Sequence, residues 1–284
     1  MTDTLTTSSV GSADKRPSAL VVSSVVLLGM IAVIAVVGRW IAPHDADDQD
    51  PLFGVTAPSS THWLGTDELG RDILSRLMAG AANALIGPAC VAVGTTLIAM
   101  TLGLMAGYYG GRIDGLISRV ADLMYSLPSL LIAIVMVGLV SGSYWLTVAV
   151  LIFLMFPSGV RVCRSASLVQ ARLPYVDAAR TLGLSDAAVM GRHILPNIAP
   201  TVLATMLLDF VGALVGFAAL AFLGMGVEPG GVDWGTILAD GQKQIFANPA
   251  MSLAPAVLLV IVAAGATIVG DWVYDRRSLK DTGR

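Results

Sequence analysis

The most informative property of this 284-residue sequence is its shortage of charge. Only 13% of the residues are charged, whereas 55% are hydrophobic and the mean hydropathy is +0.77. Soluble domains carry about 25% charged residues, so this composition excludes an ordinary soluble domain and makes lipid the solvent for much of the chain. The small net charge of −3 and the absence of a large basic footprint also exclude a nucleic acid as a partner.

Lysine is scarce, and its positions exclude a nucleotide-hydrolysis site. A phosphate-binding P-loop needs a Gly followed by Lys and then Ser or Thr. Lys15, Lys243 and Lys280 follow Asp, Gln and Leu instead. We therefore expect no catalytic residue, no cofactor and no enzymatic activity in this chain.

Cysteine and histidine are also rare. Cys90 and Cys163 lie far apart in or near apolar runs, which favours two unpaired buried thiols over a disulfide. His44, His62 and His193 are scattered along the sequence and form no HExxH pattern. The sequence predicts no metal site.

Long apolar runs are what the sequence has in abundance. A bilayer core of about 30 Å is crossed by about 20 helical residues. The first run exceeds the apolar length of a signal peptide, and Arg39 stands where small cleavage-site residues belong. We expect an all-α polytopic membrane protein with six transmembrane helices, at about 18–41, 85–108, 120–140, 145–162, 198–223 and 253–273.

The outer loops and tails complete the expected organisation. Leu69, Ile73 and Leu77 recur at intervals of four residues, which predicts an amphipathic helix along the membrane surface. The expected parts are a tail at 1–17, a first membrane helix at 18–42, a segment containing the amphipathic helix at 43–84, a five-helix core at 85–274 and a tail at 275–284.

The distribution of Lys and Arg predicts the orientation of the chain. Six crossings place both termini on one face, and 13 of the 17 basic residues belong to that face. Positive charge is retained on the cytoplasmic side, so both termini are expected to be cytoplasmic. The other face has only Arg39, Arg71, Arg76 and Lys243.

Residues 175–196 form the longest polar stretch in the second half of the chain. Gly183 is suited to end one short helix, Ser185 can cap a second, and Pro196 is expected to end it. A simple connection needs about 2–8 residues, so this cytoplasmic helix–Gly–helix hairpin is expected to carry a function. An inert loop is the alternative. A DNA-binding helix–turn–helix is disfavoured because both ends are tethered to membrane helices.

Asp209 is the clearest ionisable residue at membrane depth, about 11 residues into the fifth apolar run. Two interpretations remain open. It is either a carboxylate of a substrate path or proton relay, or a hydrogen-bonded group that fixes helix register.

Four blocks of sequence, taken in order, resemble one family. Asp177-Ala-Ala-x-x-x-Gly183, followed after nine residues by His-Ile-Leu-Pro196, resembles the coupling motif of ABC importer permeases. The blocks 62–76, 107–114 and 222–229 with Trp234-Gly look like the dipeptide/oligopeptide/nickel subfamily, and specifically its shorter six-span partner. The sequence departs from the family pattern at Asp177, where the family usually has Glu, and at Phe217, where relatives often carry an acid. It also departs at Ala221, where a Ser is usual, and at Ala82 and Asn83, in a segment that usually carries an Arg.

The resemblance implies a type I importer permease in a bacterial plasma (inner) membrane. It implies a path for di- or oligopeptides shared with a second homologous permease, an extracytoplasmic substrate-binding protein, and two cytoplasmic ATPase subunits that hold ATP and Mg. Nickel, haem or another solute is an alternative cargo. The coupling residues would be Asp177, Ala178, Ala179, Arg180, Gly183, Leu195 and Pro196, and the translocation path would include Asp209, Phe217 and Met225.

Two alternatives from other classes stay open on the sequence. One is an ion-coupled secondary transporter that uses Asp209. The other is a membrane-anchored scaffold that binds a cytoplasmic partner without transport.

Overall fold

The computed structural model describes residues 17–139, 143–226 and 231–282, with side chains to residue 276. The expected tail at 1–17 therefore lies outside the described residues except for its last residue. Of the expected tail at 275–284, residues 275–282 continue α10 and only the last two lie outside the described residues. Across the described ranges the chain is helical, as the composition predicts, and its β-bridges are isolated. The elements are α1 (Ala19–Ile41), α2 (Ile73–Tyr109), α3 (Gly111–Tyr125), α4 (Ser129–Leu139), α5 (Tyr144–Gln170), α6 (Pro174–Thr181), α7 (Asp186–Val189), a π turn (Met190–Ile194), α8 (Leu195–Phe222), α9 (Trp234–Lys243) and α10 (Ala250–Thr282).

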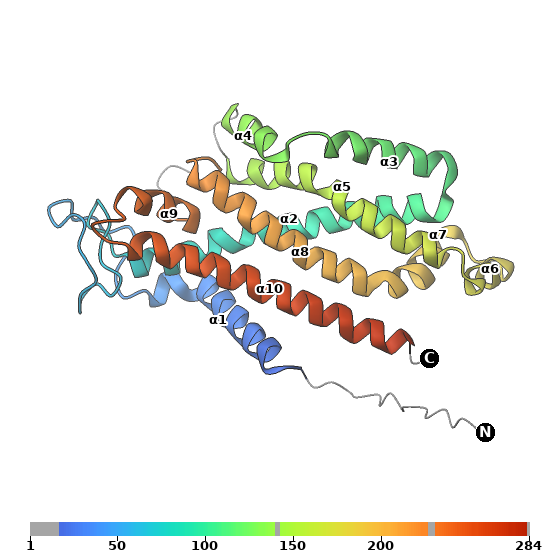
Figure 1. The fold of residues 1–284 in the computed structure, drawn as a ribbon, viewed down its shortest axis with the longest axis horizontal. Helices are drawn as coiled ribbons and strands as arrows, with labels where there is room; N and C mark the ends of the chain where they lie inside the picture. The colour runs from blue at the N-terminus through green and yellow to red at the C-terminus, as the bar shows by residue number, and fades with distance from the viewer. Residues whose placement is uncertain (1–16, 140–142, 227–230, 283–284) are drawn as a thin grey trace, which may run out of the picture.

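Most of the expected membrane helices are present as long apolar helices. Five stretches in the described part of the chain are long and apolar enough to cross a membrane, at Ala19–Ile41, Ile73–Tyr109, Tyr144–Gln170, Asp186–Phe222 and Ala250–Arg276. They run side by side along the long axis of the molecule (Figure 1). Several are longer than expected: α2 begins at Ile73 instead of about residue 85, and α5 ends at Gln170 instead of about residue 162.

The expected helix at 120–140 is not a single straight helix. It is a pair, α3 and α4, bent by 78° at the break between them, and it provides the sixth crossing only if the pair counts as one span. Pro128 lies in this break. A proline disfavours the α region for the residue before it, here Leu127, and interrupts the helix.

The amphipathic surface helix expected from residue 67 onward is wrong. Leu69 lies in a turn, and α2 begins only at Ile73, after the cap residue Asp72, whose carboxylate accepts a 2.8 Å bond from the Ser75 amide. The carboxylate of Asp67 accepts hydrogen bonds from the backbone amides of Leu69 and Arg71, at 2.9 and 3.0 Å. A carboxylate that binds nearby amides offers the backbone a turn in place of a helix.

Small residues allow α2 and α5 to approach closely. A Cβ placed on Gly107 would lie 2.7 Å from the Cβ of Ser167, and one on Gly103 would lie 2.5 Å from the Cβ of Cys163. Such contacts are shorter than side chains tolerate, so only glycine fits. Lipid provides no hydrophobic drive for helix association, and close backbone packing takes its place.

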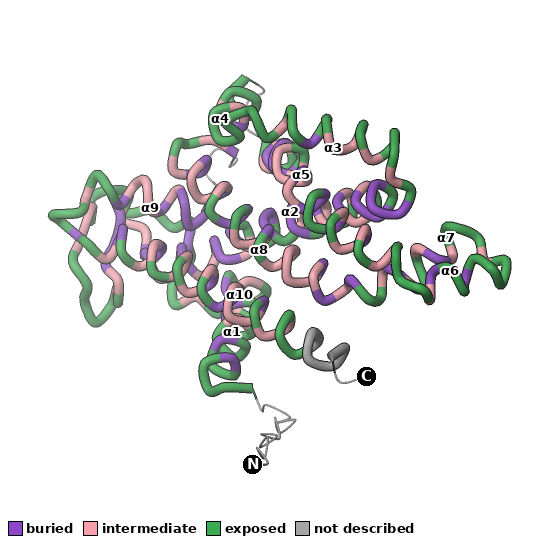
Figure 2. The backbone as a smooth tube through the Cα atoms, turned by 45° about the vertical axis from the view of Figure 1, so that its right-hand side comes forward, coloured by how far each residue is buried: buried purple, intermediate pink, exposed green. Residues whose placement is uncertain are grey.

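The polar parts of the chain gather at the two ends of the helical bundle. Figure 1 places the 43–72 segment and α9 at one end and the α6–α7 hairpin at the other. The helix α9, which the sequence did not predict, is anchored by Trp234, whose indole donates a 2.9 Å bond to the Leu77 carbonyl. Figure 2 shows burial concentrated in the central helices, whereas α3 and α4 are largely exposed.

Candidate functional site

The α6–α7 hairpin has the local structure that its sequence predicts. Gly183 adopts φ +79°, its amide bonds to the Arg180 carbonyl at 2.9 Å, and the Leu184 amide bonds to the Ala179 carbonyl at 3.3 Å. This pair of bonds ends a helix on a left-handed glycine. Ser185 then caps α7 by accepting a 3.3 Å bond from the Ala188 amide.

The hairpin is held rigidly by an apolar underside. Val176, Val189 and Ile194 are fully buried. They share one core cluster with residues of the neighbouring membrane helices, among them Leu104 of α2 and Val160 of α5. The hairpin is therefore packed on the ends of α2, α5 and α8, so a force on it reaches those helices directly.

A polar clamp joins both arms of the hairpin to α2. The phenol of Tyr108 donates a 2.6 Å bond to Asp186 in the second arm. Arg180 in the first arm donates a 3.1 Å bond to the same phenol oxygen, and its guanidinium lies 4.7 Å from the ring centroid. The bond to Tyr108 raises the pKa of Arg180 above its ordinary value.

The expected coupling residues do not all face outward. Asp177, Ala178, Arg180, Gly183 and Pro196 are exposed, Leu195 is half-buried and Ala179 is buried. Ala179 therefore supports the hairpin from inside. The sequence reading missed Leu182, which is 83% exposed beside the turn. Its signal was a large apolar residue immediately before the helix-ending glycine.

The expected end of the second arm at Pro196 is wrong. Pro196 lies in the first turn of α8, and the arm continues into that helix through the π turn at Met190–Ile194. The Leu195 amide bonds to the Met190 carbonyl five residues back. A proline ring has no N–H and crowds the carbonyl four residues before it, and the wider turn before Pro196 accommodates this.

Asp209 is buried on the α8 face that meets α2. It is 6% exposed, and the hydroxyl of Thr95 donates a 3.2 Å bond to its Oδ2. The Val91 carbonyl, 2.9 Å from the same hydroxyl, is an alternative acceptor for its one proton. This geometry is that of a carboxylate enclosed within one chain between two packed helices.

Phe217 and Met225 share one apolar cluster. Phe217 is 4% exposed, and its ring lies 5.4 Å from that of Tyr144. Met225 packs against the same cluster. Eight residues separate Asp209 from Phe217, which is about 12 Å along a helix. The structure thus brings together Phe217 and Met225, and leaves Asp209 apart.

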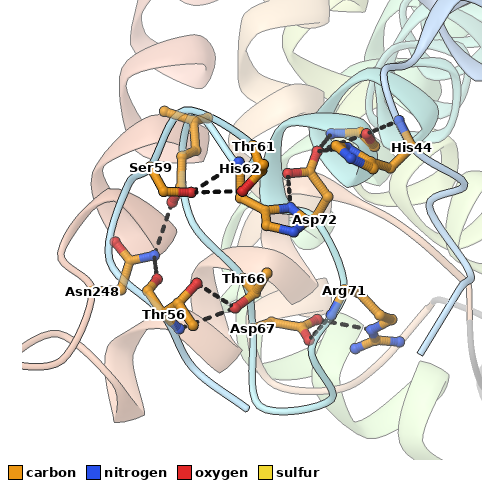
Figure 3. A network of polar contacts seen from close by, with 12 residues as sticks. His44, Thr56, Ser59, Thr61, His62, Thr66, Asp67, Arg71, Asp72 and Asn248 are labelled. Carbon is orange, nitrogen blue, oxygen red and sulfur yellow. Dashed lines mark hydrogen bonds and ion pairs between the residues drawn. The ribbon is translucent and has the colours of Figure 1, made fainter. Parts of the chain in front are cut away.

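At the opposite end of the bundle, the 62–76 block folds on itself. Asp67 and Arg76 form a buried ion pair, and Arg71 donates a 2.8 Å bond to the same carboxylate oxygen (Figure 3). His62 and His44, which looked unrelated in the sequence, both lie against the carboxylate of Asp72. The two cysteines are free, as predicted, but only Cys163 is buried and Cys90 is half-buried.

Comparisons with known proteins agree with this architecture. Residues 99–278 match the family described as binding-protein-dependent transport system inner membrane component. The chain is 30% identical over 95% of its length to a probable D,D-dipeptide transport system permease of Escherichia coli K12, of which it covers 90%. It is 34% identical over 87% of its length to a glutathione transport system permease of Pectobacterium atrosepticum, of which it covers 82%.

A dipeptide transport system permease of Alkalihalophilus pseudofirmus is 30% identical to the chain, with 92% of this chain and 86% of that protein covered. Among solved structures, the inward-facing MetNI methionine ABC transporter matches with a TM-score of 0.57 at 18% identity, with 72% of this chain and 95% of that chain covered. That likeness shows the fold of an ABC importer permease.

Proposed function

Because this chain belongs to the family of binding-protein-dependent transport system inner membrane components, a family of transport permeases, we propose that it forms half of a membrane path for short peptides. A second homologous permease supplies the other half, and an extracytoplasmic binding protein delivers the cargo. Relatives that are named as dipeptide and glutathione permeases support peptides as the substrate class.

The work of transport comes from two partner ATPase subunits that hold ATP and Mg. The observation that carries this proposal is the clamped hairpin. Its tip offers Leu182 as an apolar contact, while Val176 and Val189 seat it on three membrane helices. Movement of an ATPase groove around the tip is transmitted as a rigid body because both arms are fixed to α2 by Tyr108.

The charge distribution supports a cytoplasmic hairpin. The hairpin end carries Arg112, Arg172 and Arg192, whereas the 43–50 segment at the other end carries four aspartates. Positive residues are retained in the cytoplasm. This orientation in a bacterial inner membrane puts the hairpin in reach of soluble ATPases.

The test is Gly183→Arg in the assembled transporter, measured by peptide uptake and by ATP hydrolysis. Gly183 has φ +79° and open space around it, so arginine disturbs the tip and leaves the bundle intact. We expect membrane insertion to persist, ATP hydrolysis to lose its dependence on cargo, and uptake to fall by about tenfold or more.

The matched control is Gly111→Arg. Gly111 also has positive φ, at +55°, with open space around it, and it is the first residue of α3, outside the hairpin. We expect its uptake to stay within about twofold of wild type. Normal uptake and cargo-stimulated hydrolysis in Gly183→Arg would refute the coupling role.

A further inference from the structure

Three side chains with metal-binding atoms meet at the end of the bundle opposite the hairpin. His44 follows the end of α1, His62 lies in the loop between α1 and α2, and Asp72 caps α2 (Figure 3). Their ligand atoms all lie within 4.8 Å of one another. This grouping is unrelated to the hairpin and to Asp209, and the proposed transport role does not use it.

Two short contacts define the arrangement. The Nδ1 of His62 lies 3.0 Å from Oδ1 of Asp72, and the Nδ1 of His44 lies 3.8 Å from Oδ2 of the same carboxylate. The two imidazole rings are stacked at a tilt, with centroids 4.7 Å apart. Both rings therefore face one carboxylate from neighbouring directions.

The carboxylate of Asp72 is held in place, and the two histidine side chains beside it differ in their exposure to solvent. Asp72 is held by the amide and the hydroxyl of Ser75, at 2.8 and 2.6 Å, and its side chain is 2% exposed. The Ser75 hydroxyl also accepts a 3.0 Å bond from the His44 amide. The His62 side chain is 19% exposed and that of His44 is 42% exposed, so an ion can enter from the His44 side.

We propose that His44, His62 and Asp72 bind one divalent transition-metal ion of the Zn²⁺ type. Imidazole and carboxylate ligands suit zinc, whereas Mg²⁺ and Ca²⁺ prefer all-oxygen sites. Tetrahedral ligands about 2.1 Å from zinc lie about 3.4 Å apart. The observed separations reach that spacing through a small rotation of the exposed His44 ring.

Binding is expected to release a proton and leave one ligand position open. The ion takes the place of the proton between His62 and Asp72, because a metal ligand must be deprotonated. The fourth position faces solution beside His44 and is filled by water or by a donor from a docking protein. The bound ion cross-links the end of α1, the loop and the start of α2, and so stabilises the 43–72 segment against unfolding.

The experiment uses the full-length chain in lipid nanodiscs, without a polyhistidine tag and stripped with a chelator. Zn²⁺ is titrated in competition with a fluorescent chelator, and thermal unfolding is followed with and without Zn²⁺. We expect one ion per chain with a Kd of about 1 µM or below, and a higher unfolding temperature when the ion is bound. A tenfold excess of Ca²⁺ over Zn²⁺ is expected to change neither.

His44→Ala is the decisive variant, because the ring of His44 is exposed and makes no hydrogen bond among the described residues. We expect it to weaken Zn²⁺ binding by about a hundredfold or more, because the loss of a direct ligand costs more than the loss of an outer-shell partner. His193→Ala removes the remaining histidine, at the hairpin end, and is the matched control that keeps wild-type binding. Wild-type affinity in His44→Ala, or no Zn²⁺ bound to the wild type at about 100 µM, overturns the proposal.

Discussion

Tyr108 and Asp186 are 78 positions apart in the chain and are joined by a 2.6 Å hydrogen bond. Tyr108 is in the last turns of α2, and Asp186 is the first residue of α7. Arg180 of the first arm donates to the same phenol oxygen. One aromatic side chain of a membrane helix thus holds both arms of the hairpin.

Removing the phenol oxygen of Tyr108 tests the hydrogen bonds of the clamp without changing the packing of the ring. In Tyr108→Phe the ring still fills the cluster around Leu104, but the bonds to Asp186 and Arg180 are lost. Each bond to a charged group contributes about 1.5–3 kcal/mol. We expect normal membrane levels and uptake reduced by about fivefold, measured in the assembled transporter.

Tyr109→Phe is the matched control for this change. Tyr109 is the next residue, is 45% exposed, and packs edge-on against Tyr108 at 5.1 Å. Its uptake should equal that of wild type. Equal losses in the two variants would mean that the clamp has no special role.

The charge of Asp209 is expected to be dispensable for transport. Asp209→Asn keeps an oxygen that accepts the bond from Thr95 and removes only the ionisable group. If the residue only fixes helix register, uptake by Asp209→Asn stays within about twofold of wild type and still depends on ATP. Uptake is measured with and without a protonophore while ATP is held constant.

The opposite outcome would favour the ion-coupled transporter. In that case Asp209→Asn abolishes uptake, and collapse of the proton gradient stops the wild type at full ATP. Asp209→Leu tests the packing, because its branched side chain no longer accepts the bond from Thr95 between α2 and α8. We expect it to lower membrane levels more than Asp209→Asn does.

Asp233 makes the stability of the chain depend on pH. Burial raises the pKa of its carboxyl to about 6, and the side chain caps α9 by accepting a 2.7 Å bond from the Gly235 amide. A raised native-state pKa contributes stability that is fully present below the ordinary aspartate value and is lost as pH rises through about 6. The loss is at most about 3 kcal/mol.

Asp233→Asn keeps the cap and removes the titration. In the variant, residue 233 no longer contributes to the pH dependence of the unfolding temperature in nanodiscs between pH 4.5 and 7.5. The variant should therefore be more stable than wild type near pH 7.5. Asp240→Asn, in the same helix and partly exposed, is the control. A constant difference between Asp233→Asn and wild type across that pH range would contradict this origin of the pH dependence.

Asn248 connects the 43–72 segment to the start of α10. It is fully buried, its amide nitrogen donates to the carbonyls of Thr56 and Leu64 at 3.0 and 2.8 Å, and its oxygen accepts from the Ala250 amide at 3.1 Å. Aspartate cannot donate, so Asn248→Asp leaves two carbonyls facing a carboxylate. We expect a loss of about 2–4 kcal/mol, measured by chemical unfolding.

Asn197→Asp is the control for that loss. Asn197 also donates through its amide nitrogen, to the His193 carbonyl at 2.8 Å, but it is exposed. Water replaces the lost bond there, so its stability should change by about 0.5 kcal/mol or less. Similar losses at both positions would show that burial is not the cause.

The sequence by itself determined the features that depend on neighbours along the chain. Apolar runs identified the membrane helices, and Gly183 and Ser185 marked the turn and the cap of the hairpin. Lys and Arg gave a predicted orientation. These features follow from local propensity, from the length of a bilayer and from the conformation that glycine alone adopts readily.

Only the tertiary structure decided the features that need residues far apart in the chain. Asp67 bound amides that a helix would otherwise use, so α2 began later than its apolar stripe suggested. Tyr108 is hydrogen-bonded to Asp186, and His44 and His62 both lie against Asp72. Contact between distant side chains depends on how the helices pack. The periodicity of one segment does not show which residues of another helix it will contact.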